Sequence, residues 1–158
     1  MDISEGPSAP ATTVRGVPDV LVATDADWIA AEVDAALAGP DQRVVRVRHG
    51  RDVRPAVAAS PPDLVVLDLQ IGNMGGMATC LDLRLEEGAG RIDRVPVLML
   101  LDRSADVFLA QRAEADGWLI KPIDAFRLRR AATALMADGT YVEGVPDKSP
   151  ALPAPRPG

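Results

Sequence analysis

Five short apolar runs, each followed by a stretch with helical spacing, constrain the fold of this chain more than any other feature. The runs cover residues 20–23, 44–47, 64–67, 97–101 and 118–120. Strands that alternate with helices in this way form a parallel sheet, joined by right-handed crossovers and covered by helices on both faces. The sequence therefore predicts a doubly wound α/β domain with five parallel strands in three α/β/α layers.

Two of the runs indicate the order of the strands. Residues 44–47 carry Arg46 between valines, and Arg48 follows, which is typical of an edge strand with one face in water. Residues 64–67 are entirely apolar, as expected of a central strand buried on both faces. The order 2-1-3-4-5 of flavodoxin-like folds fits both runs. It makes the first and third strands neighbours, so Asp25 and Asp68, which follow them, would meet at one edge of the sheet.

The stretches between the runs predict five helices. Apolar residues recur there at spacings of three and four, the pattern of a helix with one buried face. Asp52 and Ser104 are the predicted N-caps of the second and fourth helices, the third helix is expected to end near Gly88, and the fourth near residue 115. The apolar stripes are Ile29, Val33, Ala36 and Leu37 in the first helix, Val53 and Val57 in the second, Met77, Cys80, Leu81 and Leu85 in the third, and Leu128, Ala131, Ala132 and Leu135 in the fifth.

Proline content separates both ends of the chain from its middle. Of the 14 prolines, three lie in the first 18 residues and five between Pro146 and Pro157. The sequence therefore predicts a flexible N-terminal arm over residues 1–16, one folded domain over residues 17–142 and a proline-rich flexible tail over residues 143–158.

Charge and cysteine content exclude several classes of partner. The net charge of −6 gives no electrostatic reason to expect nucleic acid or an anionic membrane. No apolar run approaches the roughly 20 residues that cross a bilayer, and the N-terminus lacks a signal-peptide pattern. The single cysteine, Cys80, cannot form an internal disulfide, which fits a reducing compartment. We therefore expect a cytoplasmic protein.

Charged residues follow three of the predicted strands. Asp25 and Asp68 follow the first and third strands, and Lys121 follows the fifth. Carboxylates at one sheet edge can bind a hard cation such as Mg²⁺, and a lysine beside them can bind a phosphoryl oxygen. An aspartate can also act as a nucleophile and form an aspartyl phosphate. The sequence thus predicts a site for a divalent cation and an anion.

These residues resemble those of a known family. Asp25, then Asp68 followed by QIGNMGG, then WLIKP with Lys121, resemble the receiver domain of two-component response regulators, and the resemblance covers about residues 20–135. It implies that Asp68 is the phosphoacceptor and that Lys121 binds the phosphoryl group. It also implies that Asp25, Asp68 and the backbone carbonyl of Gln70 are Mg²⁺ ligands, and that Trp118 is the aromatic residue of the conformational switch.

Several positions depart from the receiver pattern. Thr24 stands where receivers usually carry an acid, so we expect weakened Mg²⁺ binding. Leu101 stands where a Ser or Thr hydroxyl would bond the phosphoryl group, so we expect an altered switch. Asp102 adds an acid that either opposes phosphate or partly replaces the missing metal ligand, and the sequence leaves both open. Glu114 stands where receivers tend to have glycine, so we expect an altered end of the fourth helix.

The resemblance implies a stand-alone, non-enzymatic receiver in a phosphorelay. Its expected partners are a sensor histidine kinase or other phosphodonor and an unknown target protein. Its docking surface would comprise the fourth helix, fifth strand and fifth helix, which could also form a homodimer. Two alternatives stay open: a phosphorylation-independent adaptor with a degenerate acidic pocket, and a small flavodoxin-like cofactor enzyme. At single residues, Asp25 could instead cap the first helix, and Trp118 could simply cover the sheet edge.

Overall fold

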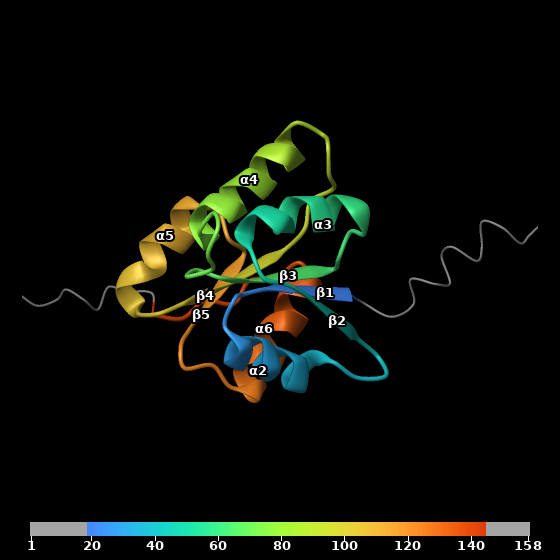
Figure 1. The fold of residues 1–158 in the computed structure, drawn as a ribbon. Helices are drawn as coiled ribbons and strands as arrows, with labels where there is room; N and C mark the ends of the chain where they lie inside the picture. The colour runs from blue at the N-terminus through green and yellow to red at the C-terminus, as the bar shows by residue number, and fades with distance from the viewer. Residues whose placement is uncertain (1–18, 145–158) are drawn as a thin grey trace, which may run out of the picture.

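A computed structural model of the chain describes residues 19–144. The predicted N-terminal arm and residues 145–158 of the predicted tail lie outside the described residues. Five strands form one sheet: β1 (Asp19–Ala23), β2 (Arg43–Val47), β3 (Leu64–Asp68), β4 (Val97–Leu101) and β5 (Gly117–Ile120). All pairs are parallel, and the order is β2-β1-β3-β4-β5, so the predicted sheet is confirmed (Figure 1).

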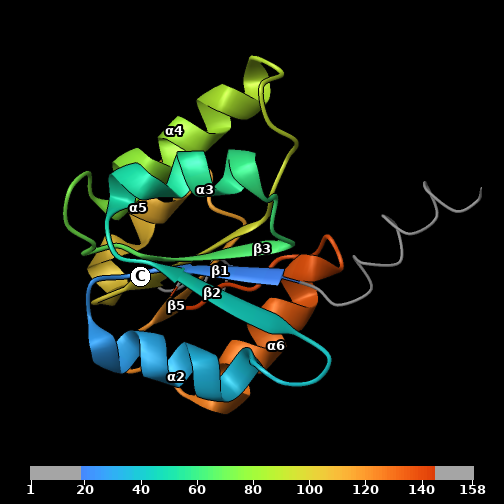
Figure 2. The ribbon, with the colours of Figure 1, turned by 45° about the vertical axis from the view of Figure 1, so that its right-hand side comes forward.

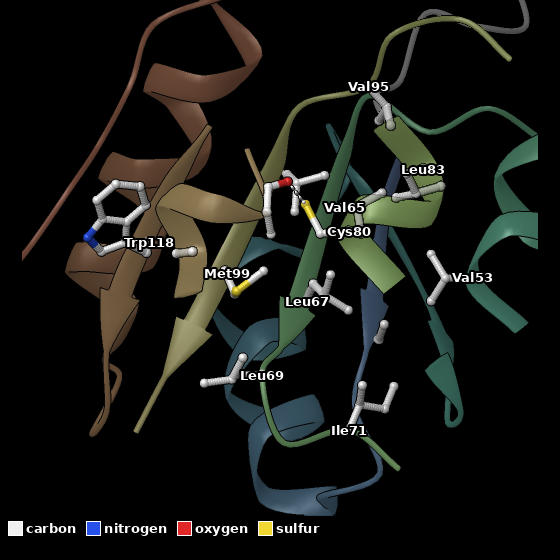
Figure 3. Packing of buried hydrophobic residues seen from close by; sticks show 14 of the residues in the cluster. Val53, Val65, Leu67, Leu69, Ile71, Cys80, Leu83, Val95, Met99 and Trp118 are labelled. Atoms are coloured by element: carbon white, nitrogen blue, oxygen red, sulfur yellow. Dashed lines mark hydrogen bonds between the residues drawn. The ribbon is translucent and has the colours of Figure 1, made fainter. Parts of the chain in front are cut away.

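Helices cover both faces of the sheet. α3 (Val53–Ala59), α4 (Gly76–Gly88) and α5 (Val107–Arg112) lie on one face, whereas α2 (Asp27–Leu37) and α6 (Ala125–Met136) lie together on the other (Figures 1 and 2). Each layer has its own hydrophobic core. Cys80 is buried in the α3–α4–α5 layer, where its thiol donates to the Ala113 carbonyl at 3.2 Å (Figure 3). Burial raises the pKa of this thiol to about 12, so Cys80 is a core residue and remains a neutral thiol.

The predicted stripes of α2, α3 and α6 are all buried, which confirms their helical registers. The prediction for α4 was wrong at Leu85, which is 70% exposed, while Leu83 is fully buried. The packing of Gly76 explains the shift. A Cβ on Gly76 would lie 2.7 Å from the Asp68 carbonyl oxygen, so the helix begins in direct contact with the backbone at the tip of β3. This contact fixes which face of α4 is buried.

The predicted caps were wrong in detail. Ser104 begins a 3₁₀ turn (Ser104–Asp106), and α5 follows it with Asp106 at the N-cap position, where the side chain makes no capping bond. Asp52 does occupy the N-cap position of α3, but again without a side-chain bond. α5 ends at Arg112 rather than near residue 115. Glu114 adopts the left-handed conformation with φ 64°, so the glycine-type helix end is kept without glycine.

Within residues 19–144, no helix is both long and apolar enough to span a membrane.

Candidate functional site

Asp68 lies at the C-terminal tip of β3 with a side chain that is almost fully buried. Its Oδ1 accepts hydrogen bonds from the ammonium group of Lys121 at 2.8 Å and from the backbone N–H of Gln70 at 3.1 Å. Its Oδ2 accepts the hydroxyl of Thr24 at 2.7 Å. A buried carboxylate is stable only when it is paired and hydrogen-bonded, and these three donors meet that requirement.

Lys121 follows β5 and joins two carboxylates. Its Nζ donates to Asp68 at 2.8 Å and to Asp102, which follows β4, at 2.7 Å. Its backbone N–H donates to the Leu101 carbonyl at 2.8 Å, so the stem of the side chain starts from a fixed point. Burial acts to lower the pKa of Lys121, but the hydrogen bonds to Asp102 and Asp68 outweigh it and hold the pKa above its ordinary value. Lys121 is therefore a fixed cation at this edge of the sheet.

Thr24, at the tip of β1, is fully buried and contacts the site directly. Its Oγ1 donates to Asp68 and accepts the backbone N–H of Ala26 at 3.0 Å. Arg46 of β2 donates to the Thr24 carbonyl through Nε at 3.1 Å, which fixes the backbone. From the sequence, Thr24 was interpreted only as a missing acid, and this contact was not predicted. The predicted strand order indicated that the first and third strands are neighbours, but the contact itself depends on the register that pairs Ala23 with Leu67.

Asp25 lies beside the site on an exposed loop. Its Oδ2 accepts the backbone N–H of Gly72 at 3.0 Å, so it connects the β1 loop to the loop after β3. It does not cap the first helix, because Ala26 is the N-cap residue of α2 and no side-chain bond is made there. Asn73 and Met74, farther along the same loop, have φ angles of 52° and 82°.

The oxygen atoms at this edge form a weak Mg²⁺ site as they stand. Mg²⁺ needs carboxylate oxygens free to coordinate it, with near-octahedral geometry. Both Asp68 oxygens already accept donors, one Asp25 oxygen accepts Gly72 N–H, and Thr24 supplies a neutral hydroxyl instead of a carboxylate. Among residues 19–144, no three His, Cys, Asp or Glu side chains gather as metal ligands. Asp102 pairs with Lys121, so its carboxylate is committed to that lysine.

The two predicted switch residues are both buried. Leu101 ends β4 and is fully enclosed in the core. Trp118 lies at the margin of the α3–α4–α5 core, and its ring nitrogen points away from Met99 (Figure 3). The indole N–H donates to the backbone carbonyl of Glu143 at 2.8 Å. This partner was not predicted from the sequence, because Glu143 lies in the predicted flexible tail.

The structure thus brings Asp68, Lys121, Asp102 and Thr24 together at the carboxyl edge of the sheet, with Asp25 beside them. A buried carboxylate next to a fixed cation can accept a phosphoryl group, because the cation can neutralise charge on the incoming oxygens. The site does not include Leu101 or Trp118, whose side chains lie in the core.

A family model matches most of the described residues. The model of the response regulator receiver domain matches residues 20–133. The chain belongs to the response regulator receiver domain family. Receiver domains are signalling domains of two-component systems, and they typically bind Mg²⁺ in the active site.

Curated relatives of the receiver are longer than this chain. Transcriptional regulatory protein AfsQ1 of Streptomyces coelicolor is 26% identical over 125 residues, which cover 78% of this chain and 53% of that protein. DNA-binding response regulator MtrA of Mycobacterium tuberculosis is 31% identical over 105 residues, covering 65% of this chain and 43% of that protein. The chain therefore spans about half the length of the curated relatives it matches, and the names of those relatives describe transcriptional regulation and DNA binding.

A solved receiver shares the fold. The receiver domain of sensor histidine kinase PA1611 from Pseudomonas aeruginosa superimposes with a TM-score of 0.68 at 20% identity, covering 77% of this chain and 98% of that chain. That protein was solved with a magnesium ion coordinated in its active site cleft. At 20% identity, this likeness shows the shared fold.

Proposed function

We propose that this receiver accepts a phosphoryl group on Asp68 and signals through protein contacts. The observation that supports the proposal is the buried Asp68 carboxylate, held at the tip of β3 by the Lys121 ammonium group at 2.8 Å. The pairing places a nucleophile and a phosphate-binding cation at one point of the sheet edge. A capping role for Asp68 would not require a lysine from β5.

Of the two Asp68 oxygens, Oδ2 is the better nucleophile for this reaction. Oδ1 accepts two donors, one of them charged, whereas Oδ2 accepts only the Thr24 hydroxyl. A hydroxyl can rotate away at little cost, and it can then donate to a phosphoryl oxygen. Oδ2 forms the new O–P bond, the bond from phosphorus to the donor's leaving group breaks, and the leaving group departs with the electron pair.

Lys121 and Asp102 set the charge balance of the reaction. Lys121 would shift one of its hydrogen bonds to the phosphoryl group, where its charge stabilises the added oxygens. Asp102 keeps Lys121 at the site but also places a negative charge near the incoming phosphate. We propose that this charge slows phosphorylation, so replacing Asp102 with asparagine should accelerate it.

Mg²⁺ has a reduced role in this proposal. Asp25, Asp68 and the Gln70 carbonyl are the donors that the family resemblance implies, and Thr24 removes the further acid that receivers usually contribute. We propose that Mg²⁺ binds weakly at this edge. The residues of the chain itself orient Asp68, through Thr24, Gln70 and Lys121.

The partners follow from the family. We propose a sensor histidine kinase or another phosphodonor upstream and a target protein downstream, with the receiver acting as a single domain in the cytoplasm and without catalytic turnover of its own. The names of the relatives describe transcriptional regulation and DNA binding, and their chains are longer, whereas this chain carries a net charge of −6. We therefore propose a protein target and no nucleic acid contact by these residues.

The test is to incubate the protein with acetyl phosphate, with and without Mg²⁺, and to measure its intact mass. We expect the added mass of one phosphoryl group, removable by hydroxylamine, which cleaves acyl phosphates. Asp68→Asn should abolish the adduct. The matched control at the same pocket, Asp102→Asn, should keep it and gain it faster.

An unmodified wild-type protein, or an adduct that survives in Asp68→Asn, would overturn the proposal. Circular dichroism of each variant shows whether the domain remains folded. A folded but unmodified protein would favour the adaptor alternative.

A further inference from the structure

Arg46 of β2 reaches the phosphoacceptor site through the backbone of Thr24. Arg46 pairs in the sheet with Val22, which belongs to the core of the α2–α6 layer, so its side chain lies on the α2 face. Its Nε and Nη2 both donate to the Thr24 carbonyl oxygen, at 3.1 and 3.0 Å. Its Nη1 donates to Oδ1 of Asp27 at 2.9 Å. One guanidinium group therefore bonds both the end of β1 and the first residue of α2.

The Thr24 carbonyl lies where the pairing of β1 with β2 ends. The Thr24 N–H still donates to the carbonyl of Val47, the last residue of β2, at 3.1 Å. Thr24 is fully buried, so its own carbonyl needs a partner inside the protein. Arg46 supplies two N–H groups to that oxygen. Only the planar fork of an arginine can do so and still bond a carboxylate, because a lysine carries a single nitrogen.

The peptide unit that Arg46 holds controls the side chains on both sides of it. The Thr24 carbonyl and the Asp25 N–H belong to one planar unit, so a rotation of that carbonyl would turn both residues. On one side, the Thr24 hydroxyl donates to Oδ2 of Asp68 at 2.7 Å and accepts the Ala26 N–H at 3.0 Å. On the other side lies the Asp25 carboxylate. The direction of the Thr24 hydroxyl toward Asp68 therefore depends on Arg46.

Asp27 anchors the other end of the guanidinium group. Its Oδ1 accepts Arg46 at 2.9 Å and Nη1 of Arg48 at 3.3 Å. The hydrogen bond from Arg46 and the charge of Arg48 lower the pKa of Asp27, so this carboxylate is ionised at neutral pH. The Arg46 side chain is 21% exposed and that of Arg48 is 58% exposed. Arg48 thus shares the Asp27 partner of Arg46, but among the described residues it makes no hydrogen bond to Thr24.

We propose that Arg46 is a positioning residue for the phosphorylation of Asp68. It holds the Thr24 peptide so that the Thr24 hydroxyl faces Oδ2 of Asp68 and can then donate to the incoming phosphoryl oxygen. Arg46 acts only through Thr24. Its effect on the reaction rests on the proposed function, whereas its hold on Thr24 can be measured in the unmodified protein. A misplacement of about 1 Å at a reacting group can slow a reaction about a hundredfold, so such a hold has a measurable effect on rate.

The first measurement is the rate at which acetyl phosphate adds a phosphoryl group, followed by intact mass. Arg46→Met removes every guanidinium bond, and Arg46→Lys keeps the charge but not the fork. We expect both to slow the reaction about tenfold, because the Thr24 hydroxyl is no longer aimed. The matched control Arg48→Gln should react like the wild type. In a Thr24→Val background, Arg46→Met should change the rate by less than about twofold, because the hydroxyl that it positions is absent.

The second measurement is amide hydrogen exchange at Ala26 in the unmodified protein. The Ala26 N–H reports the position of Thr24 Oγ1, which accepts it. We expect slow exchange in the wild type and in Arg48→Gln, and exchange about tenfold faster in both Arg46 variants, since the turn that carries this bond opens more often. If no protein takes up a phosphoryl group, the proposed function fails. The Ala26 exchange then decides by itself whether Arg46 holds Thr24.

Fast exchange at Ala26 in the wild type would overturn the proposal, and this measurement requires no variant to fold. A wild-type rate in Arg46→Lys would overturn it too, because charge alone would then be sufficient. So would equal slowing by Arg46→Met with threonine and with valine at position 24, or equal slowing by Arg48→Gln. If Arg46→Met loses its far-ultraviolet circular dichroism, Arg46→Lys in both backgrounds decides.

Discussion

At the scale of single residues, Thr24 changes the electrostatics of the site. A carboxylate at this position would lie against Asp68 and repel it unless a cation stood between them. The Thr24 hydroxyl instead donates a hydrogen bond to Asp68 at 2.7 Å and adds no charge. The negative charge of Asp68 is therefore balanced by Lys121, a residue of this chain. The same substitution that weakens the expected metal site thus stabilises the acceptor carboxylate.

Thr24→Val should lower the free energy of unfolding by about 1.5–3 kcal/mol, the usual contribution of a hydrogen bond to a charged group. Valine has nearly the shape of threonine, so the loss would come from Asp68 Oδ2 and the Ala26 N–H, which both lose their partner. Thr24→Ser keeps the hydroxyl and should lose only about 1 kcal/mol for the methyl group. Urea denaturation measures both. Equal stability of the two variants would show that the hydroxyl is not bonded to Asp68.

At the scale of elements, α4 and α5 end in the same way with different residues. The last turn of α4 closes through Gly90, whose φ is 77°, and that of α5 closes through Glu114, whose φ is 64°. In the second case the Ala115 N–H bonds to the Ala110 carbonyl at 3.0 Å, the pattern of a left-handed helix end. Arg84 donates to the Glu114 carbonyl at 2.9 Å and holds this turn in place. Tertiary contacts therefore sustain a backbone conformation that glutamate disfavours.

Glu114→Gly should raise the free energy of unfolding by up to about 1 kcal/mol, because glycine relieves the left-handed strain at some cost in unfolded-chain entropy. The carbonyl that accepts Arg84 remains in this variant. Gly90→Ala is the matched opposite change and should lower the stability by about 1 kcal/mol. Chemical denaturation of the pair checks both signs. A destabilised Glu114→Gly protein would show that the Glu114 conformation carries no strain.

Predictions of the elements were correct where the local residue pattern determines the structure. They were wrong where a contact with a distant part of the chain determines it. The stripe of α6 and the edge character of β2 follow from spacing and alternation. Leu85 was assigned to a buried stripe because spacing alone cannot reveal that Gly76 packs on the tip of β3. Glu143 was assigned to the tail because nearby prolines suggested disorder, whereas its partner Arg127 lies on α6. The helix and strand propensities of single residues carry no information on contacts between residues that are distant in the sequence.

At the scale of the whole molecule, the site joins four strand ends that are distant in the sequence. Thr24 follows β1, Asp68 ends β3, Asp102 follows β4 and Lys121 follows β5. The meeting of Asp68 and Lys121 follows from strand order alone, so the sequence could predict it. The hydrogen bond from Thr24 to Asp68 depends on the register of β1 against β3. The ion pair of Asp102 depends on Lys121, which pairs with two acids. Composition and spacing leave these contacts undetermined.

Because the four strands meet there, the Asp68–Lys121 pair should stabilise the whole sheet. Lys121→Met would leave Asp68 buried without its counter-charge, which typically costs roughly 3–5 kcal/mol of unfolding free energy. Asp68→Asn removes the charge, so the double variant should lose less than the sum of the single losses. The exposed pair of Arg43 and Asp19 is the control, and its cycle should give a much smaller coupling energy because solvent screens it.

The dependence of this coupling on pH has a definite sign. The folded-state pKa of Lys121 lies above its ordinary value of 10.5, so its contribution is fully present below pH 10.5 and is lost as pH rises through the higher folded pKa. Urea denaturation of the four proteins of the cycle should therefore give a constant coupling energy across the neutral range and a smaller one in strong alkali. A coupling that already falls between neutral pH and 10.5 would mean that Asp68 and Asp102 do not hold the lysine charged. In that case the tips of β3, β4 and β5 would be joined by neutral hydrogen bonds rather than by a fixed cation.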